Sequence, residues 1–480
     1  MINDSLPLLP LAYDRLPSSW LRMLGQEGVP IVARHDAGPT RFVLFDGRLS
    51  PPPTLRPDQQ SIEVSLFEFD VNPISISAAV APKTTHAFWQ VGDIEAREEV
   101  AAVDHRTVRE TLISRLRCAI QELGGVWMRT SPYPFPYQTA ANFRFDHDRF
   151  IADDFYRMLD AVRGHEEMTS HYLCGSQYES QPEAVAALRE MDVGSHGYRH
   201  HTYRDTAENR RNILRGIDAI RRCGVDPVGF VAPHGRYNPA LAESLQNLGV
   251  AHSSEFAAAY DDLPFTPEGS SVLQIPVHPV CLGIALDGKR ERTDKQVVAA
   301  VGEYFEAAVT EKYAAREPLF FYGHPDGRVG RYPEVLRRWI SAVAARPGVW
   351  RTSLTQFARW WRERATCRWE VHGTADRPRL VVDRTPPSFT TAVEWTSPEG
   401  VASLPLTKGR LELSVEHTCF VPRTAPIRTR PVRFEPIRGL RRWAHRLLDW
   451  EYETPVKEID AHHLRGRLKK SLRHWKEARA

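Results

Sequence analysis

The segment Phe143-Arg-Phe-Asp-His-Asp148 reads as a buried strand that ends in a polar tip. Two phenylalanines alternate with Arg144, and Asp146 and Asp148 follow as the apolar pattern stops. Side chains two positions apart on an extended chain point to the same side. One carboxylate is therefore placed to hold a metal ion while the other accepts a proton from bound water. The alternative is that Asp148 or Asp153 caps the helix that follows.

Outward from this strand, residues 142–365 alternate short β-rich runs with amphipathic helical stretches. This alternation predicts parallel strands joined by helical crossovers. Seven or eight such units in about 225 residues favour a β/α barrel over an open doubly wound sheet. The expected strands are Asn142–Asp146, Thr169–Cys174, Asp192–Ser195, Val228–Ala232, Ala251–Ser254, Val272–Val277, Leu319–Tyr322 and Val349–Thr352. The expected helices are Phe150–Val162, Pro182–Met191, Ala207–Cys223, Asn238–Leu248, Thr293–Thr310 and Tyr332–Ala345.

Three further polar groups follow predicted strands, at the end where a β/α barrel places its active site. His196 and His200 are four residues apart, so on a helical turn both imidazoles can reach one divalent ion. Pro233 and Gly235 break a strand into a loop that can aim backbone N–H groups at an oxyanion. His324 ends an apolar strand, where its imidazole can protonate a leaving amine. Each pattern also has a structural explanation, as a solvated or core histidine or an ordinary turn.

In this order, the motifs of residues 139–365 resemble the NodB-type polysaccharide deacetylases, carbohydrate esterase family 4. In that family a strand-ending Asp pair precedes H-[ST]-x-x-H, then R-x-P-x-G, and last an apolar strand that ends in a catalytic His. The resemblance implies a distorted (β/α) barrel. It also implies these roles: Asp146 as general base, His324 as general acid, Asp148, His196 and His200 as metal ligands, and Pro233, His234 and Gly235 as the oxyanion and substrate loop.

The sequence departs from the family pattern at three places. His147 splits the Asp pair, as in a variant branch of the family, so the base and the metal ligand among the two aspartates can be reversed. Gly197 replaces Ser or Thr in the histidine motif. Val231 stands where the family has Arg, and Arg144 or Arg236 is available to take over its support of the base.

The resemblance implies one divalent ion, with zinc preferred over cobalt, nickel or manganese. The expected activity is hydrolysis of a non-peptide C–N bond, the acetamide of an N-acetylated sugar or glycan precursor. The ion polarises the carbonyl and activates water, and acetate and a free amine result. The alternative, motivated by Val231 and the extra domains, is a catalytically inactive glycan-binding or scaffolding protein on the same barrel.

The chain has 480 residues, which is too long for one hydrophobic core. Four parts are expected: a small α+β domain at 1–135, the barrel at 139–365, a β-sandwich-like appendage at 366–436, and a basic amphipathic helical tail at 437–480. The first part contains strand-like runs at Ile31–Arg34, Arg41–Phe45 and Ser61–Phe69 and a helical segment near Arg106–Leu123.

Charge is nearly balanced, with 63 Lys and Arg against 60 Asp and Glu, so no nucleic-acid partner is predicted. Contact of 437–480 with a membrane surface is the less favoured interpretation, because Trp443, Trp450 and Trp475 at helical positions more often pack on the protein itself. Six scattered cysteines without a C-x-x-C motif predict buried free thiols. With neither a signal peptide nor a long apolar run, the chain is expected to be soluble and cytoplasmic.

Overall fold

The structure, a computed structural model, describes residues 6–479 except for a set of short gaps. These gaps are 37, 78–80, 82, 92–93, 102, 256–260, 282–292, 423–430, 438, 440–453, 460 and 463. Leu440, Trp443, Leu447, Leu448 and Trp450 of the predicted basic tail lie outside the described residues.

The centre of the molecule is a ring of parallel strands. The strands are β8 (Thr139–His147), β9 (Thr169–Leu173), β10 (Asp192–Ser195), β11 (His252–Ser253), β12 (Leu273–Gln274), β13 (Leu319–Gly323) and β14 (Val349–Arg351). β10, β9, β8 and β13 pair in this order, and β14 pairs with the beginning of β8. Phe230 bridges β10 to β11, and the His278 N–H donates to the Phe320 carbonyl at 2.8 Å, which closes the ring. The predicted β/α barrel is therefore present in barrel-like form.

One predicted strand, Val228–Ala232, is reduced to the single bridging residue Phe230. Gly229 has a φ of 79°, and a Cβ at this position would lie 2.3 Å from Nε2 of His252. Pro233 then lacks the N–H that would extend a ladder. The left-handed residue and the proline together prevent a regular strand here.

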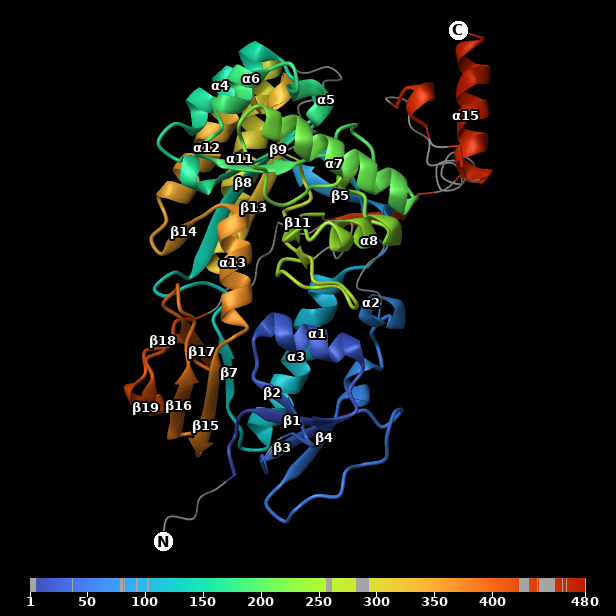
Figure 1. Ribbon diagram of the computed structural model, residues 1–480. Coiled ribbons are helices and arrows are strands. Elements are labelled where there is room, and N and C mark those ends of the chain that lie inside the picture. The colour runs from blue at the N-terminus through green and yellow to red at the C-terminus, as the bar shows by residue number, and fades with distance from the viewer. Residues whose placement is uncertain are drawn as a thin grey trace.

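Helices cover the outside of the barrel, as Figure 1 shows for α4, α11 and α12 beside β8 and β13. They are α4 (Ala152–Val162), α5 (Gly175–Tyr178), α6 (Pro182–Ala186), α7 (Thr206–Arg222), α8 (Pro239–Asn247), α11 (Asp294–Ala314), α12 (Pro333–Ala344) and α13 (Leu354–Arg364). Four of these eight start at a polar side-chain cap: for example, Asp205 accepts from the Glu208 N–H, and Thr293 forms a capping box with Gln296. Only the predicted helix Pro182–Met191 is clearly shorter than expected. No described helix is long and apolar enough to cross a membrane.

The N-terminal region forms a second, smaller sheet of parallel strands in the order β2-β1-β3-β4. Its elements are β1 (Leu11–Asp14), α1 (Ser18–Glu27), β2 (Ile31–Ala33), β3 (Phe42–Phe45), β4 (Gln60–Glu63) and α3 (His105–Glu122). The apolar face of α3, with Leu112 and Leu116, packs in one core with Trp20 and Phe42. The strands expected at Ile31–Arg34 and Arg41–Phe45 and the expected helix are thus confirmed, whereas the strand expected at Ser61–Phe69 ends at Glu63 and continues as a 3-10 helix over Val64–Glu68.

The hairpin β5 (Lys83–Val91) and β6 (Ile94–Ala101) leaves this region and joins the barrel. Ala87, Trp89 and Val100 are fully buried in the barrel core. In Figure 1, β5 accordingly lies near the barrel strands and apart from β1 to β4. Its free edge pairs with β20 (Arg433–Pro436) from the far end of the chain.

The β-rich region after the barrel forms two three-stranded sheets. One is β15 (Arg368–Gly373), β16 (Pro378–Arg384) and β19 (Gly409–Glu412), and the other is β18 (Gly400–Pro405), β17 (Ala392–Ser397) and β7 (Trp127–Thr130). Because β7 precedes the barrel, the second sheet joins the parts predicted at 1–135 and 366–436. Trp369 and Trp395 also share the core that contains Trp20. These two parts therefore do not have separate cores.

The end of the chain contains α15 (Leu464–Glu477), whose Lys469 pairs with Glu208 on α7 at 3.3 Å. Trp475 is 54% exposed, so the expectation that it packs on the protein is wrong. All six cysteines are free thiols, as predicted. Cys118 and Cys419 are nevertheless exposed, which corrects the expectation that the thiols are buried.

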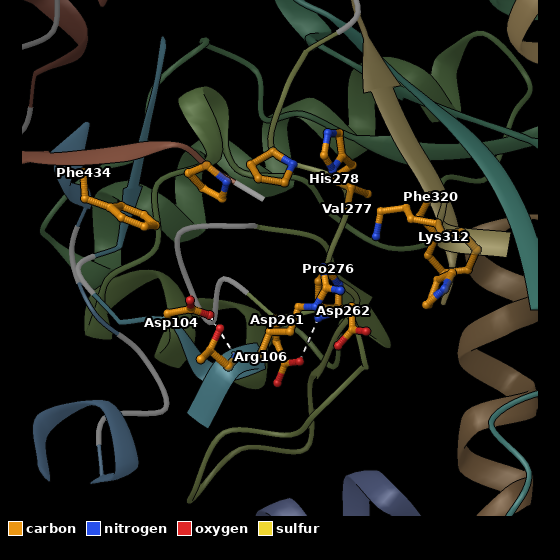
Figure 2. A pocket seen from close by; sticks show the side chains of 14 residues that line it. Asp104, Arg106, Asp261, Asp262, Pro276, Val277, His278, Lys312, Phe320 and Phe434 are labelled. Carbon is orange, nitrogen blue, oxygen red and sulfur yellow. Dashed lines mark hydrogen bonds between the residues drawn. The ribbon is translucent and has the colours of Figure 1, made fainter. Parts of the chain in front are cut away.

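A buried network of ion pairs connects α3 to the barrel. Arg109 of α3 pairs with Asp261 at 3.0 Å and also with Glu27 and Asp262. A cavity of about 120 Å³ beside it is lined by Arg106, Asp262, Lys312 and neighbouring residues (Figure 2). Three carboxylates, those of Glu110, Asp262 and Glu317, lie within 4.8 Å of one another. Arg106 and Lys312 neutralise Glu317, so these acids belong to the ion-pair network.

Replacing Arg109 with methionine is expected to lower the free energy of unfolding by about 3–5 kcal/mol, because three carboxylates lose a buried cation. Urea denaturation measures the change. Arg115→Met on the same helix is the control: Arg115 pairs with the half-exposed Asp70, and its loss should cost far less. Equal effects of the two substitutions would contradict the structural role of Arg109.

Burial keeps His252 uncharged inside the barrel. Its Nε2 lies 3.0 Å from the Tyr172 hydroxyl, and burial lowers its pKa to about 3. In the unfolded chain the His252 side chain binds a proton below about pH 6.5, whereas in the folded protein it stays neutral. The contribution of His252 to stability is therefore present above about pH 6.5 and is lost as the pH falls below that value. Between pH 7 and pH 5 the loss amounts to about 2 kcal/mol. The free energy of unfolding of His252→Gln should vary less with pH than that of the wild type. The control His35→Gln, at an exposed position, should keep the pH dependence of the wild type.

Candidate active site

The polar strand ends predicted from the sequence meet in one cavity of about 460 Å³ at the carboxyl ends of the barrel strands. Asp146 lies at the end of β8 and Asp148 just after it, His196 and His200 follow β10, and His324 follows β13. His147 points the other way, where its Nδ1 lies 2.7 Å from the Tyr178 hydroxyl and its Nε2 lies 3.1 Å from Nδ1 of His171. The alternation expected for residues 146–148 is therefore present.

Asp148, His196 and His200 form a group that fits a divalent cation. Oδ1 of Asp148 lies 3.2 Å from Nε2 of His196 and 3.1 Å from Nε2 of His200. Asp148 does not cap α4, because that helix starts after Ile151 without a side-chain cap. Two imidazoles and one carboxylate are a donor set typical of zinc, and three protein ligands leave a position open for water or substrate.

A second hydrogen bond fixes the tautomer of His196. Its Nδ1–H donates to the Val231 carbonyl at 2.7 Å, which leaves Nε2 of the neutral ring with a lone pair that faces Asp148. Two electron-rich atoms then face each other at close range, an arrangement that a cation between them stabilises. Val231 takes part through its backbone, so its side chain is not required for this contact.

The loop from His196 to His200 is not the helical turn that the spacing predicted; the chain bends there instead. Gly197 has a φ of 78°, and a Cβ on it would lie 2.6 Å from Nδ2 of Asn212. Asn212 of α7 holds the loop: its Oδ1 accepts from the Arg199 N–H at 2.7 Å, and its Nδ2 donates to the Arg199 carbonyl at 3.0 Å. Glycine replaces the family's Ser or Thr because this backbone conformation and the nearby amide exclude a side chain.

Asp146 lies beside the ligand group with one oxygen fixed and the other unoccupied. Its Oδ2 accepts from Arg144 at 2.7 Å, and its buried Oδ1 has no hydrogen-bond partner in the described part of the chain. Arg144 is itself buried, donates to the Ser254 carbonyl and hydroxyl, and lies over the Tyr322 ring at 4.8 Å. Of the two arginines considered for support of the base, Arg144 makes the contact.

His324 faces Asp148 from β13, with Nε2 at 3.6 Å from Oδ2. Its Nδ1 lies 2.8 Å from Nη1 of Arg328, and since arginine only donates, Nδ1 accepts and the neutral ring carries its proton on Nε2. Burial lowers the pKa of His324 to about 4, and Arg328 adds to this shift. His324 therefore presents a neutral Nε2–H to the cavity.

The loop Pro233–Gly235 forms a tight turn beside His200. His234 has a φ of 58°, and its ring meets the His200 ring edge-on with centroids 4.4 Å apart. The Gly235 N–H donates to the Ala232 carbonyl at 2.9 Å, and the Ala232 N–H donates to Glu255 at 2.9 Å. Burial raises the pKa of Glu255 to about 7. Glu255 directly follows the predicted strand Ala251–Ser254, a position that could have revealed it.

Sequence reasoning missed the part of the cavity wall that β5 and β6 supply. Nζ of Lys83 donates to the His234 carbonyl at 2.8 Å, and Glu98 lies 3.4 Å from the Tyr322 hydroxyl. Burial lowers the pKa of Lys83 to about 8 and raises that of Glu98 to about 7. Lys83 and Glu98 are separated from the motif at residues 143–148 by at least α3 and β7, and no local sequence pattern connects them to that motif.

Comparison with known proteins identifies a family for part of the barrel. Residues 143–253 match the family described as polysaccharide deacetylase. This confirms the family resemblance for that segment. No curated protein matches the chain.

Several solved structures are similar over about half of the chain. A Mycobacterium smegmatis protein assigned to the polysaccharide deacetylases is 21% identical, covers 48% of this chain and 92% of its own, and has a TM-score of 0.42. A family 4 carbohydrate esterase from Streptomyces lividans in complex with acetate is 17% identical, with 44% and 91% covered and a TM-score of 0.31. A carbohydrate esterase family 4 pseudoenzyme from Bacillus anthracis is 14% identical, with 48% and 69% covered and a TM-score of 0.32.

Proposed function

We propose that this chain, with its polysaccharide deacetylase segment at residues 143–253, is a metal-dependent hydrolase that removes the acetyl group from an N-acetylated sugar or glycan precursor. The observation that carries the proposal is the convergence of Asp148, His196 and His200 beside the unpartnered Oδ1 of Asp146. A cation site next to a free base is what hydrolysis of an amide by water requires.

Asp148, His196 and His200 would hold the divalent ion, zinc in the first place. When bound, such an ion acts as a Lewis acid toward the acetamide carbonyl and lowers the pKa of water. Asp146 accepts the proton of the attacking water at Oδ1, while Arg144 keeps the carboxylate oriented through Oδ2.

Two other groups act on the reacting amide. The backbone N–H of His234, the first after Pro233, donates to the oxyanion. The Nε2–H of His324 meets the departing nitrogen, and Arg328 holds this tautomer. His324 was expected to act as a general acid. Because Arg328 donates to Nδ1, the contact favours a hydrogen-bonding role for the Nε2–H, with the proton for the amine passing from Asp146.

The test is to measure the metal content of the purified protein and acetate release from a panel of N-acetylated sugars. We expect about one zinc ion per chain and stoichiometric acetate and amine. Metal without acetate release from any member of the panel would favour the inactive glycan-binding alternative. Absence of metal after loading with zinc would reject the site.

A further inference from the structure

The cavity has a basic wall that removal of an acetyl group does not require. Lys83 and Arg97 come from β5 and β6, Arg236 follows the oxyanion loop, and Arg328 follows β13. Four cations therefore line one cavity together with the metal ligands. A sugar bearing only hydroxyl and acetamido groups has no charge for them to bind.

The carboxylates on the same wall do not neutralise these cations completely. Glu98 is buried against the Tyr322 hydroxyl, and Glu99 lies 3.8 Å from His86. Arg97 and Arg236 form no ion pair with any described residue. Lys83 donates to the His234 carbonyl; burial lowers its pKa although Glu98 and Glu99 act in the opposite direction, and the charge of Arg236 adds to the lowering. Cations that repel one another in a cavity are stabilised when an anion binds between them.

The positions of these cations relate them to the reacting group. Arg236 is two residues beyond His234, whose ring contacts His200 of the ligand group. Lys83 is bonded to the same His234. Lys83 and Arg236 thus lie at the loop beside the ligand group, and Arg97 and Arg328 line the same cavity.

Rigid structure holds the wall in place. Trp89 and Ala87 anchor β5 in the barrel core, and β6 and β20 pair with β5 on its two sides. An arginine or lysine on such a strand loses little further freedom when a ligand binds, which favours specific recognition of a charged group.

We infer that this basic wall, with Lys83 and Arg236 at its centre, binds an anionic group of the substrate. The substrate is then an N-acetylated sugar that carries a phosphate or a carboxylate near its acetamido group. This inference rests on the proposed deacetylase function and names its substrate class. Arginine and lysine bind both anions through charge-assisted hydrogen bonds.

The test compares N-acetylglucosamine with its 1-phosphate, its 6-phosphate and N-acetylmuramic acid, using the zinc-loaded full-length protein. We expect kcat/KM for at least one charged sugar to exceed that for the neutral sugar by about 10- to 100-fold, the effect of one or two charge-assisted hydrogen bonds. The phosphates and the carboxylate differ in position and charge, so their order identifies which anion fits. Added salt should raise the KM of the charged sugar more than that of the neutral one.

Lys83→Gln and Arg236→Gln should each reduce the ratio of charged to neutral kcat/KM about tenfold. Arg433→Gln is the matched control, because Arg433 pairs with Glu95 and covers Phe88 outside the cavity wall. It should leave the ratio unchanged. Unfolding curves of all three variants exclude loss of folded protein as the cause.

The outcomes separate this inference from the proposed function. Equal turnover of charged and neutral sugars by the wild type would overturn the inference and leave the deacetylase proposal intact. If no sugar is hydrolysed, calorimetry of the phosphosugars replaces kinetics. If the phosphosugars then bind more tightly than the neutral sugar, and both glutamine variants lose this difference, the anion site is supported although the deacetylase proposal fails. Equal binding of charged and neutral sugars overturns the inference.

Discussion

The double variant His196→Ala/His200→Ala is expected to bind no zinc and to release acetate at least about 10³-fold more slowly than the wild type. Two of the three ligand atoms of the group are imidazole nitrogens next to Oδ1 of Asp148, so their removal leaves one carboxylate. A single carboxylate does not hold zinc against dialysis. Elemental analysis after dialysis, together with an acetate assay, measures both effects.

A control is needed because the double variant also removes two imidazoles from a buried site. His35→Ala/His372→Ala deletes the same number of histidines outside the barrel, on the N-terminal region and on β15. This protein should keep its metal and its activity. Retention of one zinc ion by the His196/His200 variant would show that the metal centre lies elsewhere.

Asp146→Asn should keep the metal and lower kcat by about 10² to 10⁴, the usual contribution of a general base. The amide keeps the shape of the carboxylate but cannot take up the proton at Oδ1. Asp148→Asn is the paired variant and should instead lose metal, because Asp148 is the carboxylate next to both histidines. Metal analysis and kcat of the two variants thus assign the two roles.

The reverse pattern would exchange the roles of the two aspartates. Asp146→Asn also removes the negative charge that pairs with the buried Arg144. The unfolding curve of this variant should therefore be recorded beside its kinetics. An Asp146→Asn protein that folds, binds zinc and keeps wild-type kcat would exclude Asp146 as the base.

Local sequence patterns were sufficient to predict the barrel and its polar rim. A strand with Phe143 and Phe145 has to be buried, and its polar end has to lie where the parallel strands finish. The same reasoning placed Asp148, His196 and His324 around one point. It gave the wrong backbone for the histidine loop, because spacing alone does not show that Gly197 has a positive φ.

Contacts between distant segments could not be predicted in the same way. β7 pairs with β17 across the whole barrel sequence, and no local pattern encodes that partner. Around Glu98 the sequence places three charged residues in a row, Arg97, Glu98 and Glu99, which is typical of a solvated segment. Only its packing on the barrel shows that Glu98 is buried and that Lys83 reaches the active-site loop.

The pairing of β5 with β20 has a consequence for how the protein is made. Until the ribosome has synthesised Arg433–Pro436, one edge of β5 has no strand beside it, although every residue of the proposed metal centre has already been translated. The nascent chain can therefore complete the barrel before it completes the cavity wall. Maturation of the cavity is thus delayed to the last stage of translation, and a ribosome that stalls late would release a chain with its ligands present and one wall unsupported.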